Sequence, residues 1–202
     1  MKKNLIYLFK NLFIRSFDDD LTDSQKNIVR AEVKARKKNI TESFKKEQAT
    51  AVYGKIEQMP EFIKAKTVLM YWSVSDELPT HHFIRKWCHA KNILLPVVKG
   101  EHMTIRPFIS EEMLVQGNFR IMEPKSGHDY LKAVDLVIVP GIAFDRKKRR
   151  IGRGKGYYDK YLKSKSIIKW GIGFDFQLYE SIPSASFDIK MDRIITPSET
   201  IW

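Results

Sequence analysis

The stretch VDLVIVP at residues 134–140 decides the fold class, because it is apolar at almost every position. A strand with apolar side chains on both faces belongs to a sheet that is covered on both sides, which is typical of parallel sheets. Other short runs rich in strand-forming residues lie before and after it in the chain, at 67–72, 92–98, 103–108, 166–174 and 191–196. Together these segments predict the strands of one central sheet.

Helical periodicity fills the chain before and between these strands. Apolar residues recur at intervals of three or four from Thr22 onward, with a break near residues 39–41, where Thr41 is placed to cap a second helix. Pro60 is expected to end this helical region. Two more helices are expected, at about 79–90 and at 157–164.

Because strands alternate with helices, we predict an α/β protein, a single domain with a mostly parallel central sheet flanked by helices on both faces. No linker, repeat or low-complexity tract divides residues 22–202, which we assign to this domain. Residues 1–21 are assigned to an N-terminal extension. Lys10, Asn11 and Arg15 interrupt its apolar residues, and the run is too short for a membrane span. We therefore expect a docking or frayed segment and no stable membrane association.

The composition fits a folded protein with acidic ligands. Apolar residues make up 43% of the chain and its formal net charge is +12. Such a charge favours nucleic acid, anionic membranes or small polyanions such as nucleotides, although a basic surface also serves solubility alone. The single cysteine, Cys88, excludes disulfides within the chain and thiolate zinc sites. It fits a reducing compartment, so we expect a cytoplasmic protein.

A basic, glycine-rich segment follows the central strand. Seven of the ten residues from Arg146 to Lys155 are Arg or Lys, and glycines alternate at 152, 154 and 156 before the short helix. Glycine lets backbone N–H groups approach a ligand closely, and ligands of open α/β sheets bind beyond the carboxyl ends of the strands. The segment therefore favours a phosphate cradle. It matches neither the P-loop nor the dinucleotide motif, and a basic loop with turn glycines remains an alternative on these residues alone.

The longer string from Pro140 to Leu162, PGIAFD followed by RIGRGKGYYDKYL, resembles the signature of the 5-formyltetrahydrofolate cyclo-ligase family. The resemblance covers roughly residues 22–196. Further matches come in the family's order: Lys26, Arg30, Trp72, SDE (75–77), MEP (122–124), Gly173, Phe174, Gln177, Pro183, Asp188, Asp192 and Thr196. Two positions depart from it. Lys148 stands where glycine is usual and alters either the turn or only its charge. Phe187 replaces a common histidine, and it either affects a catalytic step that the histidine serves or changes packing alone and leaves activity intact.

The resemblance implies an enzyme that uses ATP and Mg2+ to convert 5-formyltetrahydrofolate into 5,10-methenyltetrahydrofolate, with release of ADP and phosphate. It implies phosphoryl activation of the formyl oxygen and ring closure by N10. ATP contacts are implied for Lys26, Arg30, Arg150, Ile151, Gly152, Arg153, Gly154, Lys155, Gly156, Tyr157 and Tyr158. Catalytic roles are implied for Lys26, Arg30, Arg153 and Lys155. Folate contacts are implied for Trp72, Glu77 and Tyr157, and magnesium ligands for Asp159 and Asp192.

The residue types suit these roles, but each also has a plainer explanation. Lys26 and Arg30 are spaced i,i+4, so they share one helix face, where they either grip a phosphate or are solvated. Asp159 is either a hard oxygen ligand for Mg2+ or a first-turn aspartate of a helix. Trp72 either stacks on the pterin ring or belongs to the core, and Glu77 either accepts hydrogen bonds from that ring or is an exposed loop acid.

The predicted partner is a small molecule, a reduced folate with or without a polyglutamate tail, bound by a monomer. The cations hypothesised to attract such a tail, or else to form a solvated face, are Lys34, Arg36, Lys37 and Lys38.

Two other function classes compete with a cyclo-ligase. A nucleic-acid-binding protein would explain the charge, but no known binding module is present, so no nucleic-acid partner is expected. An inactive relative that senses ATP or folate is favoured only by Lys148 and Phe187.

Overall fold

A computed structural model of the chain describes residues 21–117, 121–125 and 127–202. Except for Leu21, the predicted extension at residues 1–21 lies outside the described residues. Residues 21–37 are helical. In the described ranges, no helix combines the length and the apolar composition that crossing a membrane requires.

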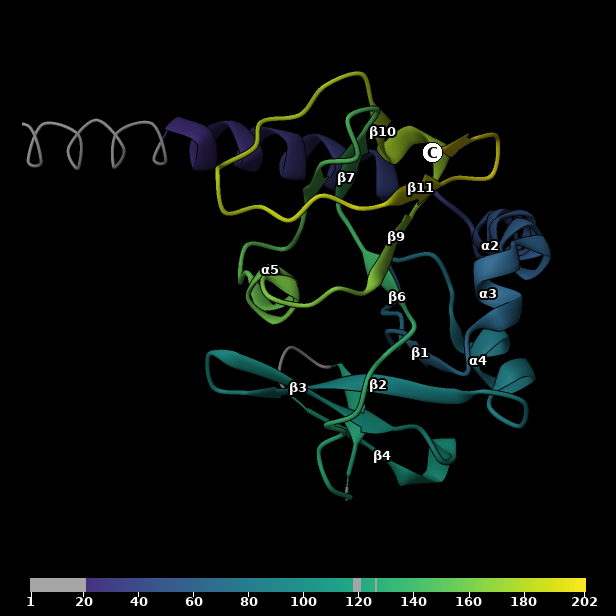
Figure 1. The fold of residues 1–202 in the computed structure, drawn as a ribbon. Coiled ribbons are helices and arrows are strands. Elements are labelled where there is room, and N and C mark those ends of the chain that lie inside the picture. The colour runs from purple at the N-terminus through teal and green to yellow at the C-terminus, as the bar shows by residue number, and fades with distance from the viewer. Residues whose placement is uncertain (1–20, 118–120, 126) are drawn as a thin grey trace, which may run out of the picture.

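A seven-stranded sheet forms the centre of the molecule, in the order β12-β11-β9-β6-β1-β2-β3 (Figure 1). The strands are β1 (Thr67–Leu69), β2 (Asn92–Lys99), β3 (His102–Pro107), β6 (Leu136–Pro140), β9 (Ile168–Ile172), β11 (Arg193–Ile195) and β12 (Thr200–Ile201). The five inner strands pair in parallel, and only the edge strands β3 and β12 are antiparallel to their neighbours. The predicted mostly parallel sheet is therefore confirmed.

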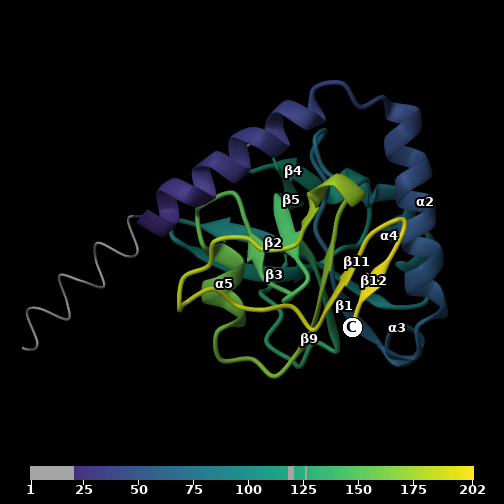
Figure 2. The same cartoon turned by 90° about the horizontal axis from the view of Figure 1, so that it is seen from above.

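Helices cover both faces of this sheet, as the sequence predicts (Figures 1 and 2). They are α2 (Glu42–Gln58), α3 (Pro60–Lys64), α4 (His81–Trp87) and α5 (Tyr157–Leu162). Leu136 and Ile138 of β6 share a buried cluster with α2, α3 and α4, while Val137 and Val139 share another with Leu162 of α5. The central strand is thus buried on both sides, which explains its unbroken apolar sequence.

The helix boundaries follow local capping. The Thr41 side chain accepts a hydrogen bond from the Phe44 N–H at 3.1 Å, so the predicted cap of the second helix is confirmed. The prediction that Pro60 ends the helical region is wrong. Pro60 is the first residue of α3, because proline lacks the N–H that an opening turn leaves unpaired.

Two small sheets complete the fold, and the sequence does not predict either. One contains β7 (Ala143–Asp145), β8 (Arg150–Ile151) and β10 (Leu178–Tyr179), and the other is the hairpin of β4 (Leu114–Gln116) and β5 (Met122–Pro124). The chain also has short 3-10 helices at Glu111–Met113 and Asp175–Gln177. Helix 21–37 packs onto the first small sheet through Val33, which shares a buried cluster with Ala143 and Ile151.

Candidate active site

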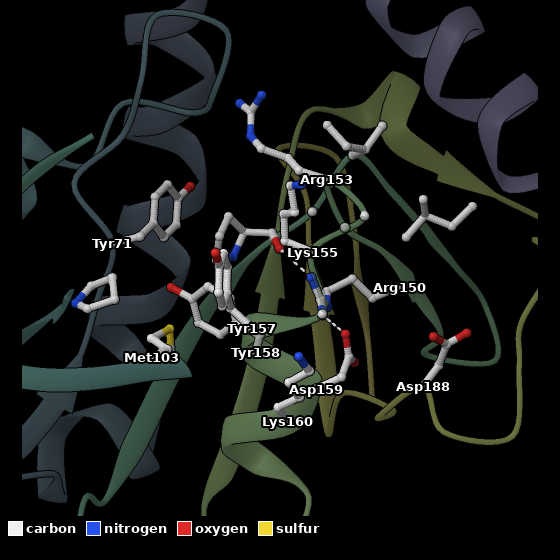
Figure 3. Close-up of a pocket in the computed structure, with 18 of the residues that line it drawn as sticks. Tyr71, Met103, Arg150, Arg153, Lys155, Tyr157, Tyr158, Asp159, Lys160 and Asp188 are labelled. Atoms are coloured by element: carbon white, nitrogen blue, oxygen red, sulfur yellow. Dashed lines mark hydrogen bonds and ion pairs between the residues drawn. The ribbon is translucent and has the colours of Figure 1, made fainter. Parts of the chain in front are cut away.

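A pocket of about 520 Å³ lies beyond the carboxyl ends of β1 and β6. Helix 21–37, the segment after β1, the loop at 150–156 and the start of α5 all contribute to its wall. In Figure 3, Tyr71 and Met103 lie on one side of the pocket and Arg150 and Asp188 on the other, with Tyr157 between them. This edge of an open α/β sheet is where ligands bind.

The glycine loop connects β8 to α5, and two of its glycines are required by the backbone. Gly154 has φ of +97° and Gly156 has φ of +66°, in the left-handed region that favours glycine. Gly156 is also the N-cap residue of α5. Arg30 donates from Nε to the Gly152 carbonyl oxygen at 2.9 Å, which ties helix 21–37 to the loop.

Arg150 is a buried cation beside this loop. Its Nη2 donates to Asp159 Oδ2 at 2.8 Å and its Nη1 to the Pro140 carbonyl oxygen at 3.3 Å. A Cβ at Gly152 would lie 2.7 Å from Arg150 Nη1, so this glycine leaves room for the guanidinium. The second Asp159 oxygen, Oδ1, accepts the Ile189 N–H at 3.1 Å. Arg150 and Asp159 therefore connect β8, α5 and the segment before β11.

Arg153 reaches from the loop to the segment after β1. Its Nη2 donates to Asp76 Oδ1 at 2.6 Å and to Glu77 Oε1 at 3.0 Å, and Lys37 Nζ lies 3.4 Å from Asp76 Oδ2. The Lys37 pKa lies below its usual value, because burial and the nearby Arg153 lower it and together outweigh the raising effect of Asp76 and Glu77. Burial also raises the Asp76 pKa, but Lys37 and Arg153 outweigh this and leave that pKa below its usual value. Asp76 is therefore an ionised bridge between two cations.

Lys26 is held on the other side of the loop. Its Nζ lies 2.6 Å from Asp188 Oδ2, and the two side chains are only 5% and 11% exposed. Asp188 Oδ2 also accepts the Ala185 N–H at 2.7 Å. The Phe187 ring lines the pocket, with its centroid 5.5 Å from Lys26 Nζ. Phe187, one of the two residues that depart from the family pattern, therefore packs against a predicted ATP contact.

The part of the pocket away from these cations is mainly apolar. Its wall contains Tyr71, Pro96, Val98, Met103 and Ile121, together with the buried acid Glu123. Trp72 also lines the pocket but is 8% exposed and already stacks on His81, with the ring centroids 4.1 Å apart. The pocket thus has a cationic half and an apolar half.

Comparison with known proteins identifies the family. The family model described as the 5-formyltetrahydrofolate cyclo-ligase family matches residues 22–197. The chain belongs to this family. It is 28% identical over 180 residues to the 5-formyltetrahydrofolate cyclo-ligase of Escherichia coli K12, covering 84% of this chain and 98% of that protein. It is 28% identical over 190 residues to the Mus musculus protein of the same name, covering 86% and 94%.

A solved structure supports the same assignment. The 5,10-methenyltetrahydrofolate synthetase of Aquifex aeolicus superposes with a TM-score of 0.79 and 32% sequence identity, covering 87% of this chain and 91% of that one. The resemblance seen in the sequence and the predicted fold class are therefore confirmed.

The pocket of this cyclo-ligase family member gathers nearly all the predicted site residues. Each predicted ATP and folate contact lines it, as does Asp159. Asp192 does not. Arg193 of β11 pairs in register with Trp170 of β9, so Asp192 lies at the amino ends of the parallel strands, away from the pocket edge. Its Oδ2 accepts the Lys169 N–H at 2.7 Å. Of the two predicted magnesium ligands, the structure therefore places Asp159 in the pocket and Asp192 outside it.

The basic run at 146–150 is less available to a polyanion than its sequence indicates. Arg146 pairs with Glu180 and Glu199, while Arg149 pairs with Asp145. Arg150 pairs with Asp159. These local ion pairs weaken the charge argument for a nucleic-acid surface.

Sequence reasoning missed much of the apolar half. Pro96, Met103 and Glu123 come from the separate strands β2, β3 and β5, and Tyr71 follows β1. No motif with an assigned role contains these residues. Glu123 lies in the MEP match, but that match carries no stated chemistry. Asp76, inside the matched SDE, was likewise given no role, although it contacts both Lys37 and Arg153. The short distance between the SDE segment and the glycine loop exists only in the folded chain.

Proposed function

We propose that this chain is a 5-formyltetrahydrofolate cyclo-ligase, which converts 5-formyltetrahydrofolate and ATP into 5,10-methenyltetrahydrofolate, ADP and phosphate. The observation that carries this proposal is a single pocket with a cationic and an apolar half, built around the signature loop of the family. Clustered cations suit a triphosphate, and an apolar wall with few polar groups suits the faces of a pterin ring.

The reaction needs two bond exchanges. The formyl oxygen attacks the γ-phosphorus of ATP, the bond between that phosphorus and the β,γ-bridging oxygen breaks, and ADP leaves. N10 then bonds to the activated carbon and gives up its proton, while the carbon–oxygen bond breaks and phosphate leaves with the formyl oxygen. Phosphoryl transfer asks a protein mainly for positioning and charge neutralisation. No protein nucleophile takes part.

The cations of the pocket fit this requirement. We assign Lys26 and Arg30 to the phosphates from helix 21–37, and Arg153 and Lys155 to the phosphates from the glycine loop. Donors that are already in place stabilise charge as it develops on a transferring phosphoryl group. Tyr157 lies between the two sides of the pocket in Figure 3, a position suited to contact with both substrates.

We also propose Mg2+ as the companion of ATP. Across the described ranges, no group of three or more His, Cys, Asp and Glu side chains could hold a metal by itself. Mg2+ commonly binds one or two carboxylates together with phosphate oxygens and water, so Asp159 suits a Mg–ATP complex once Mg2+ replaces Arg150 as the partner of its carboxylate.

Asp159→Asn is expected to raise the Mg2+ concentration for half-maximal rate about tenfold, because it removes one anionic ligand. A Mg2+ titration at saturating ATP measures this, and an unchanged midpoint would exclude Asp159 as a ligand.

The proposed function is tested by following the methenyl product in the near ultraviolet with purified protein, Mg–ATP and 5-formyltetrahydrofolate. We expect absorbance to grow only when ATP is present. A flat trace from folded protein that still binds ATP would instead indicate the inactive relative. Retention on DNA that weakens with salt, without turnover, would indicate a nucleic-acid-binding protein.

A groove beside the pocket suits a polyglutamate tail, and we include such a tail in the proposed substrate. The groove of about 390 Å³ shares Met103 and Lys160 with the pocket, and Lys132 and Lys165 also line it. Two of the four candidates from the sequence are less suitable. Lys37 is buried against Asp76, and Arg36 pairs with Glu32.

The double substitution Lys132→Glu and Lys165→Glu is expected to raise KM for a pentaglutamate substrate about tenfold more than KM for the monoglutamate, because it reverses two charges beside the tail. KM measured for both substrates at low and high salt gives the ratio. The matched control is Lys64→Glu on α3, an exposed lysine outside the groove. An equal rise for both substrates would contradict the tail assignment.

The proposal also includes a monomer in the cytoplasm. The lone Cys88 is free, which is consistent with a reducing compartment. Sedimentation of the purified protein at a mass near 23.7 kDa would support the monomer, and fractionation of cells would test the location.

A further inference from the structure

Glu123 is a buried acid with an unusual position in the pocket wall. It lies on β5, is 6% exposed, and its Oε1 accepts the Val98 N–H of β2 at 3.2 Å. Four described acids that are at least partly buried line the pocket. Glu77, Asp159 and Asp188 are each paired with a cation of the site. Glu123 alone among these four forms no ion pair with a described residue.

The backbone at Gly117 leaves the space that the Glu123 carboxyl group occupies. A Cβ at Gly117 would lie 2.5 Å from both Cδ and Oε2 of Glu123, so only glycine leaves the side chain where it is. Gly117 closes the β4–β5 hairpin, since its N–H donates to the Ile121 carbonyl oxygen at 2.8 Å. Burial raises the Glu123 pKa, against the opposing effects of the Val98 N–H and Arg106. Holding a carboxyl group here costs stability, which a binding role would explain.

The surroundings of Glu123 define what it could bind. Pro96, Val98, Met103 and Ile121 present apolar surface to the same half of the pocket. These walls can contact the faces of a flat ring, but the polar edge of that ring needs a hydrogen-bonding partner. Glu77, which the family resemblance suggests for the pterin, is already bound by Arg153 and by the Val74 N–H. Glu123 is therefore the better-placed acceptor.

We propose that Glu123 determines specificity for the pterin ring by accepting hydrogen bonds from its 2-amino group and its N3–H. These two donors are adjacent and parallel, as in a guanidinium group, and a carboxylate accepts such a pair bidentately. Gly117 is then a positioning residue, because it leaves the space that Glu123 occupies. This inference rests on the proposed function for the identity of the ligand.

Glu123→Gln tests the inference by equilibrium binding of 5-formyltetrahydrofolate in the absence of ATP. A glutamine whose amide oxygen keeps the Val98 contact turns its NH2 group toward the N–H groups of the ring. Because two donors then face each other without an acceptor, we expect the Kd for the folate to rise about 10- to 100-fold. The Kd for ATP is expected to stay within about twofold, because the cationic half is unchanged. The Tm should be no lower than that of the wild type, since the buried carboxyl group is replaced by a neutral group of the same shape.

A modified ligand separates direct contact from a structural effect. When the 2-amino group of the folate is replaced by methyl, the wild type should lose about 10- to 100-fold in affinity, while Glu123→Gln should lose much less. Gly117→Ala supplies a second variant. It keeps the carboxyl group but displaces it, so Kd for the folate should rise with little change in Tm.

The outcomes are distinct. An unchanged folate Kd in Glu123→Gln, or the same penalty for the methyl ligand in both proteins, would overturn the inference. Folate binding that depends on Glu123, together with no turnover by the wild type, would support the inference and refute the proposed catalytic function. Turnover without dependence on Glu123 would do the reverse.

Discussion

Arg153→Ala is expected to lower kcat/KM for both substrates by about 10²- to 10³-fold, the usual effect of removing one preorganised charge donor from a transition state. Arg153 lies in the pocket wall on the signature loop, and its guanidinium already contacts Asp76 and Glu77 on the segment after β1. We propose that it neutralises charge on the transferring phosphoryl group. Steady-state kinetics with each substrate varied in turn measures the loss.

Two controls separate charge from geometry in this experiment. Arg153→Lys keeps the positive charge but loses the planar fork, so its activity should lie between those of the wild type and Arg153→Ala. Arg146→Ala removes an arginine of the same basic run that pairs with Glu180 and Glu199 outside the pocket, and it should cost less than about twofold. A similar loss in Arg146→Ala and Arg153→Ala would contradict a specific role for Arg153.

The parts of the fold that the sequence predicts are those with continuous local patterns. The apolar run at 134–140 indicates a strand buried on both faces, and β6 is such a strand. The missed elements are strands of two or three residues, such as β8 and β10. Segments this short have no measurable periodicity, and they form because the main sheet and helix 21–37 present partners for them.

In the site, too, the sequence identifies residues that form one continuous motif but not residues that folding brings together. The glycine loop is a continuous string, so the sequence identifies it. The structure does not bring Asp192 to the pocket, and sequence order does not reveal this, because Asp192 precedes β11 and so lies at the amino edge of the sheet. The sequence does not identify Glu123 as a site residue, because its place in the pocket wall depends on the contact between β5 and β2.

Lys148 shows how a departure from a family pattern is absorbed. It adopts φ of 62°, and its N–H donates to the Asp145 carbonyl oxygen at 2.9 Å. Its own carbonyl oxygen accepts the Met191 N–H at 2.8 Å. The lysine therefore occupies a left-handed turn suited to glycine, at a backbone cost of about 1–2 kcal/mol.

Lys26→Met is expected to lower the free energy of unfolding by about 3–5 kcal/mol, the usual cost of removing one partner from a buried ion pair. The Lys26 and Asp188 side chains are 5% and 11% exposed, and their charged atoms lie 2.6 Å apart. The pair joins helix 21–37 to the segment before β11. Without the ammonium group, the Asp188 carboxylate keeps only local partners such as the Ala185 N–H. Urea unfolding of the ligand-free protein measures the loss.

A double-mutant cycle shows whether the uncompensated charge is the cause. Asp188→Asn alone should also destabilise the protein, whereas Lys26→Met combined with Asp188→Asn should recover much of the loss, because no buried charge is left unpaired. The matched control is Lys169→Met. Lys169 also pairs with an aspartate, Asp192, at 3.0 Å, but that aspartate is 50% exposed, so we expect a cost below about 1 kcal/mol. Equal losses in Lys26→Met and Lys169→Met would show that burial does not set the strength of the pair, and that the docking of helix 21–37 depends on its apolar contacts instead.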